Sequence, residues 1–328
     1  MGRLIDGEWS NHDLGTDDKG RYVRRAARYR GQIRADGSTD FAPEAGRYHL
    51  YVSHACGWSH RTMLFRALKR LEDAVSVTVV EPFMGEQGWT LENGSDPIHG
   101  ADKLYEVYLA ANPTYTGRAS VPVLWDRKSS TIVSNESRDI ARAFDREFDD
   151  LGDSSVHYFD DDLSTAIDEM IAANYGPINN GVYACGFASS QEAHEGASLA
   201  LFDRLGQLEE LLGTRRYLLG DRLTAADWFL FPTLYRFDSV YYVHFKCCRR
   251  QIRDYPNLWA YTRELYQFPG VAETCNMEQI RRHYFTSHES IHPRRYLPLP
   301  PDIDWHQPHG RESTSPSDSA GGAGHDRV

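Results

Sequence analysis

The segment of this sequence best suited to nucleophilic chemistry is Cys56 followed by Gly57, Trp58 and Ser59. Cys56 comes directly after an alternating, strand-like run and directly before a run with helical spacing, so it is expected at a strand-to-helix junction. The unpaired N–H groups and the dipole at the start of a helix favour the thiolate, which is the reactive form of a cysteine. A buried structural cysteine is the alternative, but this position favours a catalytic nucleophile.

Position 59 indicates which partner such a thiolate would have. A dithiol oxidoreductase has a second cysteine there to resolve a mixed disulfide. Because this chain has Ser59, the resolving thiol is expected to come from outside, and glutathione is the obvious candidate in a reducing cytoplasm. The five cysteines are odd in number and include no CxxC pair, so we predict neither a disulfide scaffold nor a metal site.

Two further pairs of residues point to a peptide-like ligand. Val121-Pro122 stands at the start of a predicted strand, where a cis peptide bond would expose the backbone of Val121. Glu136-Ser137 opens a predicted helix, and its N–H groups, hydroxyl and carboxylate suit the charged end of a γ-glutamyl group. An ordinary edge-strand proline is the alternative for Val121-Pro122, but the pattern favours the cis bond, whereas Glu136-Ser137 alone would be read as an ordinary helix cap. In this order after Cys56, the three signals are far more specific.

Hydrophobic periodicity predicts a mixed domain followed by helices only. The expected strands cover residues 47–53, 75–80, 121–125 and 131–134, and the expected helices cover residues 59–71, 102–110 and 136–148. This β-α-β-α-β-β-α order is that of a thioredoxin-like domain. Beyond residue 163, helices are expected over 191–212 and 257–267, and a capping box of Thr224 and Asp227 opens another over the run 228–237.

Four regions follow from this pattern. They are an N-terminal extension over residues 1–44, a thioredoxin-like domain over 45–150, an all-helical substrate domain over 160–295 and a tail over 296–328. The extension is expected to wrap around the body without forming a domain. The tail is polar from His306 onward, so its end is expected to be disordered.

Composition excludes several classes of protein. The 328 residues, 41% of them hydrophobic and 25% charged, suit a globular protein of two domains. A net charge of −11 argues against general nucleic-acid binding. The sequence has no apolar run of about 18 residues and no secretory signal pattern, so we expect no membrane span and a cytoplasmic location.

The chain resembles the glutathionyl-hydroquinone reductases, the Xi class of the glutathione transferase superfamily, over about residues 40–300. Beyond the cysteine motif, the resemblance rests on YTGR at 115–118, VPVLWD at 121–126, SNES at 134–137, INNGVY at 178–183, LFPTLYRF at 230–237, HFKC at 244–247, YPNLW at 255–259 and RHY at 282–284. It implies a thioredoxin-like domain followed by an all-helical domain, and a homodimer.

The resemblance also implies the role of each site residue and the reaction. It assigns catalysis to Cys56, aromatic-substrate contacts to Tyr183 and Tyr284, and the binding of glutathione, or of a related γ-glutamyl thiol, to Trp89, Arg118, Val121, Glu136 and Ser137. The implied reaction is the reductive deglutathionylation of a quinone-derived aromatic substrate through a Cys56–glutathione mixed disulfide. No metal is implied.

This sequence departs from the family at the cysteine motif, where Gly57 and Ser59 replace the usual Pro and Ala. The change brings the motif closer to that of monothiol glutaredoxins, which hold an iron–sulfur cluster with glutathione. Three alternatives therefore remain: an omega-like thiol transferase or dehydroascorbate reductase using the same cysteine, a non-catalytic ligand carrier, and an iron–sulfur scaffold. Conventional addition of glutathione to electrophiles is disfavoured, because Cys56 would form a disulfide with the thiol.

Overall fold

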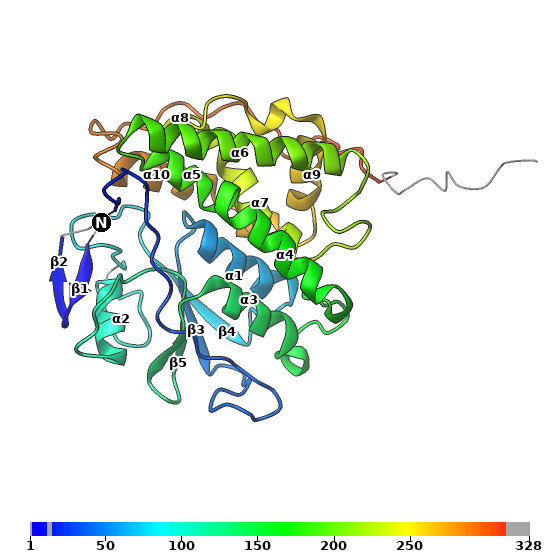
Figure 1. Ribbon diagram of the computed structural model, residues 1–328. Helices are drawn as coiled ribbons and strands as arrows, with labels where there is room; N and C mark the ends of the chain where they lie inside the picture. Colours follow the sequence, from blue (N-terminus) through cyan, green and yellow to red (C-terminus); the bar gives the residue numbers. More distant parts are fainter. Residues whose placement is uncertain (1, 12–14, 93, 313–328) are drawn as a thin grey trace, which may run out of the picture.

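The computed structural model describes residues 2–11, 15–92 and 94–312, and its centre is a mixed sheet of four strands (Figure 1). The strands are β3 (Tyr48–Val52), β4 (Val75–Val79), β5 (Val123–Asp126) and β6 (Thr131–Ser134), in the order β4-β3-β5-β6. Strands β3 and β4 are parallel, and the pairs β3–β5 and β5–β6 are antiparallel. All four predicted strands are confirmed within two residues at each end.

The sheet is buried on both faces because its side chains alternate between two cores. Leu50 and Leu124 belong to the core shared with helices α1 (Gly57–Leu68) and α3 (Ser137–Arg146), which pack against each other. Tyr51 and Trp125 belong to a second core that contains residues of α2 (Leu104–Ala111). This arrangement confirms the predicted thioredoxin-like order of elements.

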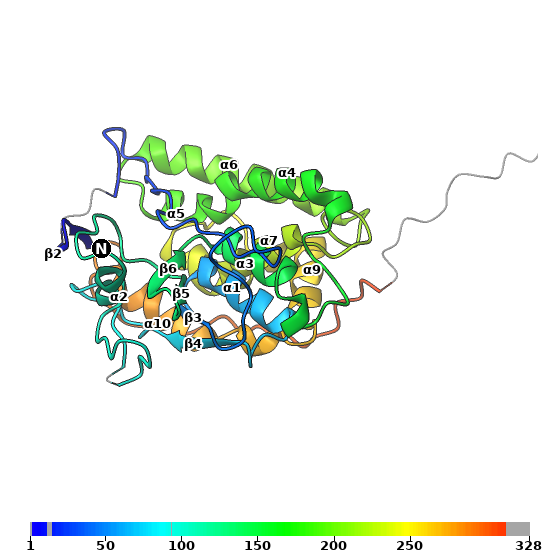
Figure 2. The same cartoon turned by 90° about the horizontal axis from the view of Figure 1, so that it is seen from below.

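The described chain after α3 is mainly helical up to residue 287, and α7 of this helical layer packs against α1 (Figures 1 and 2). The α-helices are α4 (Ser164–Asn174), α5 (Gly181–Gly186), α6 (Gln191–Leu212), α7 (Ala225–Arg236), α8 (Tyr242–His244), α9 (Pro256–Tyr266) and α10 (Met277–Ser287). Two π-helical turns, η3 (Tyr175–Asn179) and η4 (Phe237–Tyr241), follow α4 and α7. None of the helices in this part of the chain combines the length and apolar character that spanning a membrane requires.

Helix α7 is the centre of the helical layer, and all of its residues are buried. The predicted capping box opens it: the Thr224 N–H donates to Asp227 Oδ2 at 2.8 Å, and Thr224 Oγ1 lies 3.0 Å from the same oxygen. Tyr261 Oη also donates to the Asp227 carboxylate at 2.8 Å. The cap therefore also ties α7 to α9.

The N-terminal extension begins with a hairpin that the sequence reading missed. Strands β1 (Arg3–Ile5) and β2 (Glu8–Ser10) pair across Asp6-Gly7, which both have positive φ angles, 49° and 86°. Asp-Gly between short apolar runs is a hairpin signal that the sequence does carry. Leu4 and Gly117 exchange backbone hydrogen bonds of 2.8 and 2.9 Å, which dock the hairpin on the loop before the cis proline.

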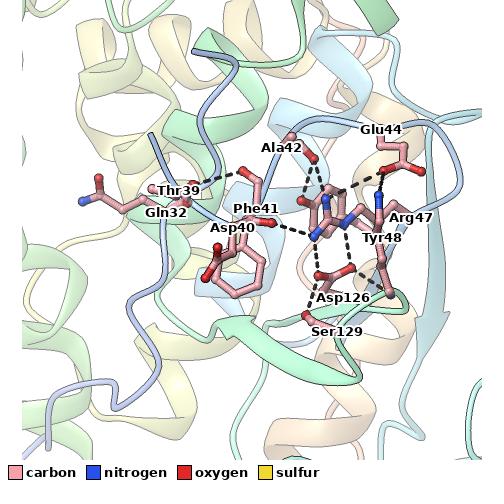
Figure 3. Close-up of polar contacts among 11 residues, drawn as sticks. Gln32, Thr39, Asp40, Phe41, Ala42, Glu44, Arg47, Tyr48, Asp126 and Ser129 are labelled. Atoms are coloured by element: carbon pink, nitrogen blue, oxygen red, sulfur yellow. Dashed lines mark hydrogen bonds and ion pairs between the residues drawn. The ribbon is translucent and has the colours of Figure 1, made fainter. Parts of the chain in front are cut away.

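A buried ion pair fixes the end of the extension (Figure 3). Arg47 Nε and Nη2 donate to the two oxygens of Asp126 at 2.8 and 2.7 Å, and both side chains are at most 5% exposed. Arg47 Nη2 also donates to the Asp40 carbonyl at 3.0 Å, and Tyr48 Oη donates to the Ala42 carbonyl at 2.7 Å. The pair therefore joins β3, β5 and the chain that precedes them.

The C-terminal tail packs against the helical layer as far as Arg311, which is further along the chain than its composition predicts. The ring of Trp305 lies 4.9 Å from that of Tyr235 and 5.3 Å from that of Tyr266. Arg311 is 3% exposed and donates to the carbonyls of residues 212, 215 and 216 and to Glu264. The prediction that the chain is disordered from His306 onward is therefore wrong for residues 306–311. Arg311 orders this segment by donating to carbonyls at and just after the end of α6. Residues 313–328, the rest of the predicted disordered end, lie outside the described residues.

Candidate functional site

Cys56 lies at the strand-to-helix junction, as predicted, and is the N-cap of α1. Its sulfur accepts a hydrogen bond from the Ser59 N–H at 3.5 Å and lies 3.7 Å from the carbonyl oxygen of Val121. The peptide bond between Val121 and Pro122 is cis, as predicted. The thiol is half-buried, so it is held by backbone groups and can still meet a ligand.

The turn before Cys56 is fixed by a buried arginine of the helical layer. Arg236, at the end of α7, is fully buried; its Nη2 donates to the His54 carbonyl at 2.7 Å and its Nε to the Ala55 carbonyl at 3.0 Å. Arg236 Nη1 also lies 2.9 Å from Nδ1 of His60, on α1. The position of the nucleophile therefore depends on both domains.

Two cavities meet at Cys56, and Trp58, Arg118 and Val121 line both of them. The larger one, of about 430 Å³, is called the arginine-lined cavity, because its lining includes Arg3, Arg24, Arg25, Arg28 and Arg118. The smaller one, of about 130 Å³, is called the aromatic cavity, because its lining includes Trp9, Tyr22, Trp58, Trp89, Tyr183, Phe187 and Tyr284.

The arginine-lined cavity contains four of the five residues that were predicted to bind the thiol peptide. Arg118, Val121, Glu136 and Ser137 all line it. Glu136 is the N-cap of α3, and its Oε1 accepts from the Arg138 N–H at 3.1 Å. A carboxylate, a hydroxyl and a helix start therefore lie in the lining of a cavity whose other charged residues are all arginines.

Trp89, the fifth predicted residue, lies in the aromatic cavity instead. Its indole stacks on the His283 ring, with centroids 4.7 Å apart and planes 25° apart. The structure thus places Trp89 with the aromatic-substrate residues, apart from Glu136 and Ser137. Its role in thiol binding stays a prediction.

The structure brings the two predicted tyrosines together and adds a third. The Tyr183 and Tyr284 hydroxyl oxygens lie 2.5 Å apart, and Tyr241 Oη lies 3.1 Å from Tyr284 Oη. Burial raises the pKa of all three phenols, so they are neutral and can donate hydrogen bonds at ordinary pH. Tyr241 was missed because it belongs to a π-helical turn between two of the recognised segments.

Two histidines, His283 and His288, also line the aromatic cavity. His283 Nδ1 donates to the Pro82 carbonyl at 2.9 Å, and His244 Nε2 lies 3.0 Å from His288 Nδ1. Burial lowers the pKa of His283 to about 4 and holds that of His288 well below its usual value, so both rings are neutral near pH 7. Among the described residues, no cluster of three or more His, Cys, Asp or Glu is placed to hold a metal ion.

Arg24 also lines both cavities and was not predicted. Its guanidinium carbon lies 3.9 Å from the Trp58 ring centroid and 4.8 Å from that of Tyr183. Its Nε donates to Asn180 Oδ1 at 2.7 Å, which anchors it to the helical domain. The signal that could have identified it is the run RRAAR at 24–28, because such a basic cluster is unusual in a chain of net charge −11.

The fold and the site together define a class. A thioredoxin-like domain whose first helix begins at a cysteine, joined to an all-helical domain that encloses the thiol, is the architecture of a cysteine-type glutathione transferase. Two family models agree: "Glutathione S-transferase, N-terminal domain" matches residues 55–147, and "Glutathione S-transferase, C-terminal domain" matches residues 191–264.

Comparison with individual relatives shows which family of glutathione transferases the chain belongs to. The chain is 47% identical to glutathionyl-hydroquinone reductase YqjG of Escherichia coli, with 95% of this chain and 99% of that protein covered. It is also 47% identical to glutathionyl-hydroquinone reductase PcpF of Sphingobium chlorophenolicum, with 92% and 96% covered. The solved Xi-class glutathione transferase of Natrialba magadii is 45% identical, with 96% and 98% covered and a TM-score of 0.90. The chain therefore belongs to the Xi-class glutathionyl-hydroquinone reductases of the glutathione transferase superfamily.

Proposed function

We propose that this protein removes glutathione reductively from glutathionyl-hydroquinones, with Cys56 as the nucleophile and glutathione as the second substrate. The observation that carries the proposal is the position of the Cys56 thiol, where a cationic, peptide-sized cavity and an aromatic cavity meet. A glutathionyl-hydroquinone has the same two parts, joined by one sulfur. The names of the relatives YqjG and PcpF support the same activity.

In the first step, the Cys56 thiolate attacks the sulfur of the substrate. A disulfide forms between Cys56 and glutathione while the bond from sulfur to the aromatic carbon breaks. The electron pair of that bond goes to the aromatic carbon, which takes up a proton and leaves as the hydroquinone. The protein thiol is oxidised and the aromatic ring is reduced by two electrons.

In the second step, the thiolate of a free glutathione attacks the sulfur of the bound glutathionyl group. Glutathione disulfide leaves, and the Cys56 thiolate is regenerated. Ser59 cannot take the place of this thiol, because it has no sulfur. Its N–H instead donates to the Cys56 sulfur and stabilises it as a leaving group.

The neutral tyrosines supply what the leaving aromatic carbon needs. Tyr183 and Tyr284 both line the aromatic cavity, and their hydroxyls are hydrogen-bonded to each other. A phenol so placed can donate to a hydroquinone oxygen and pass a proton to the carbon.

We expect Tyr284→Phe to lower kcat about 100-fold or more, because the change removes the hydroxyl that contacts both Tyr183 and Tyr241. The rate of hydroquinone release in a single turnover with excess enzyme measures this step directly. Tyr296→Phe, at a tyrosine that is 60% exposed and outside both cavities, is the matched control and should react like the wild type. An unchanged rate in Tyr284→Phe would remove the tyrosines from the mechanism.

Two measurements test the proposed function: the stoichiometry of the reaction, and the rates of turnover with alternative substrates. With a glutathionyl-hydroquinone and excess glutathione, one hydroquinone and one glutathione disulfide should appear per substrate consumed. Turnover of a glutathione mixed disulfide or of dehydroascorbate, measured in parallel, should be slower. Faster turnover of these two would favour the thiol-transferase activity suggested by the omega-like relative of Schizosaccharomyces pombe, which is 40% identical. A homodimer and a cytoplasmic location also stay predictions, and light scattering of the purified protein tests the first.

A further inference from the structure

The arginine-lined cavity carries more positive charge than the residues predicted to bind the thiol peptide supply, because only one of those residues, Arg118, is an arginine. Its lining contains five arginines and one acidic residue, Glu136, although the whole chain has a net charge of −11. Four of the five arginines come from the N-terminal extension, and Arg118 alone comes from the thioredoxin-like domain. The extension therefore forms a cationic wall of the cavity.

The segment that carries this wall is anchored on both sides of the cavity. At one end, Arg24 Nε donates to Asn180 of the helical domain at 2.7 Å. At the other end, Tyr29 exchanges backbone-to-side-chain and backbone hydrogen bonds of 3.0 and 3.1 Å with Asn135, directly before Glu136. Figure 1 shows this segment, in dark blue, running from the helical layer toward the sheet. Residues 25–28 are thus held across the opening beside Cys56.

Arg25 and Arg28 make little use of their charge within the fold. Both are exposed, and neither side chain forms a hydrogen bond or ion pair with another residue in the described ranges. The guanidinium carbon of Arg28 lies 5.8 Å from the Tyr115 ring centroid, which orients it over the cavity lining. On the same lining, Nε of Arg3 is buried and has no hydrogen-bond acceptor among the described residues.

We propose that Arg25 and Arg28 bind a carboxylate of the thiol peptide, so that the N-terminal extension is part of its binding site. This inference rests on the proposed function for the identity of the ligand. Glutathione has two carboxylates and one ammonium group, and Glu136 suits the ammonium. A guanidinium is suited to a carboxylate because it offers parallel N–H donors and keeps its charge at any physiological pH.

The test measures binding without turnover. Titration calorimetry gives the Kd of S-methylglutathione, which cannot form a disulfide, for the wild type, Arg28→Gln and the double variant Arg25→Gln/Arg28→Gln. We expect Kd to rise about 10-fold in the double variant, as for the loss of a charged hydrogen bond. Arg21→Gln is the matched control, because Arg21 belongs to the same extension, pairs with Asp17 and does not line the cavity.

Two analogues of S-methylglutathione distinguish a direct contact between the arginines and one carboxylate from a general electrostatic attraction of the ligand to the arginines. The glycine ethyl ester of S-methylglutathione lacks one carboxylate, and the 4-aminobutyryl analogue, in which that group replaces the γ-glutamyl residue, lacks the other. The proposal requires the effect of the double variant to vanish for one analogue and to persist for the other. The analogue for which it vanishes identifies the carboxylate.

Equal weakening of all three ligands, or no weakening of any, would overturn the proposal. Because the readout is binding, its failure is distinct from a failure of the proposed function. If the wild type turns over no glutathionyl-hydroquinone but the variants still lose affinity for S-methylglutathione, the reaction is wrong and the binding site stands. If turnover is normal and affinity does not change, only the role of Arg25 and Arg28 is wrong.

Discussion

Replacing Cys56 with serine is expected to abolish turnover of a glutathionyl-hydroquinone, with kcat lowered by at least about 1,000-fold. A serine hydroxyl is similar in size and can keep the hydrogen bond from the Ser59 N–H. It is not ionised near neutral pH and does not form a stable bond to sulfur, so the covalent intermediate is lost. Neither Tyr183 nor Arg24 can replace it, because the reaction requires a sulfur nucleophile.

Mass spectrometry of the intact protein measures this directly. The wild type, incubated with a glutathionyl-hydroquinone and no free thiol, should gain one glutathionyl group as it releases hydroquinone. Cys56→Ser should gain none. Cys248→Ser is the matched control, because Cys248 is exposed and lies outside both cavities, and it should react like the wild type. An adduct on Cys56→Ser, or one that disappears in Cys248→Ser, would place the nucleophile elsewhere.

Replacing Asp126 with asparagine is expected to lower the free energy of unfolding by about 3–5 kcal/mol. The substitution keeps the shape of the side chain but leaves the guanidinium of Arg47 buried without its counter-charge. That guanidinium also orders the Asp40 carbonyl, so the loss extends to the end of the N-terminal extension. Lys128→Gln is the matched control: its ion pair with Glu44 is 65% and 51% exposed, and we expect a change below about 1 kcal/mol.

The pH dependence of unfolding gives a second measure of how much the ion pair between Arg47 and Asp126 stabilises the folded protein. Burial opposes ionisation of Asp126, but hydrogen bonds from Arg47, Ser129 and Lys128 outweigh it and lower its pKa in the folded state. The stabilisation is therefore fully present above the pKa of the unfolded chain, near 4, and is lost as pH falls through the lower folded value. Denaturant unfolding at pH 7 and pH 3 should show a smaller difference between wild type and Asp126→Asn at pH 3. An equal difference at both pH values would show that ionisation of Asp126 does not contribute.

The strands and helices that were predicted correctly could be predicted because their signals are local. The β-branched run of β4, the spacing of α6 and the capping box of α7 all lie within a few residues of the structure they specify. The same holds for Glu136 as a helix cap and for the cis bond at Val121. For these features, short segments of the chain determine the geometry.

What could not be predicted depends on contacts between distant segments. Arg24 and Arg28 become cavity residues only because Asn180 and Asn135 anchor the chain on either side of them. Arg311 is ordered by carbonyls about 95 to 99 residues earlier in the chain, which its polar surroundings in sequence conceal. The stacking of Trp89 on His283 of α10 likewise joins residues that lie far apart in the sequence.

The contact between Arg236 and the turn before Cys56 has a consequence for the order in which the protein is made. The two carbonyls that Arg236 binds precede it by 181 and 182 residues. At roughly 5–20 residues per second, a ribosome needs on the order of 10–40 s to reach Arg236 after it has passed them. During that interval the thiol lacks the group that fixes its turn. The nucleophile of this protein is therefore completed late in synthesis, when the helical domain docks on a cysteine that emerged long before it.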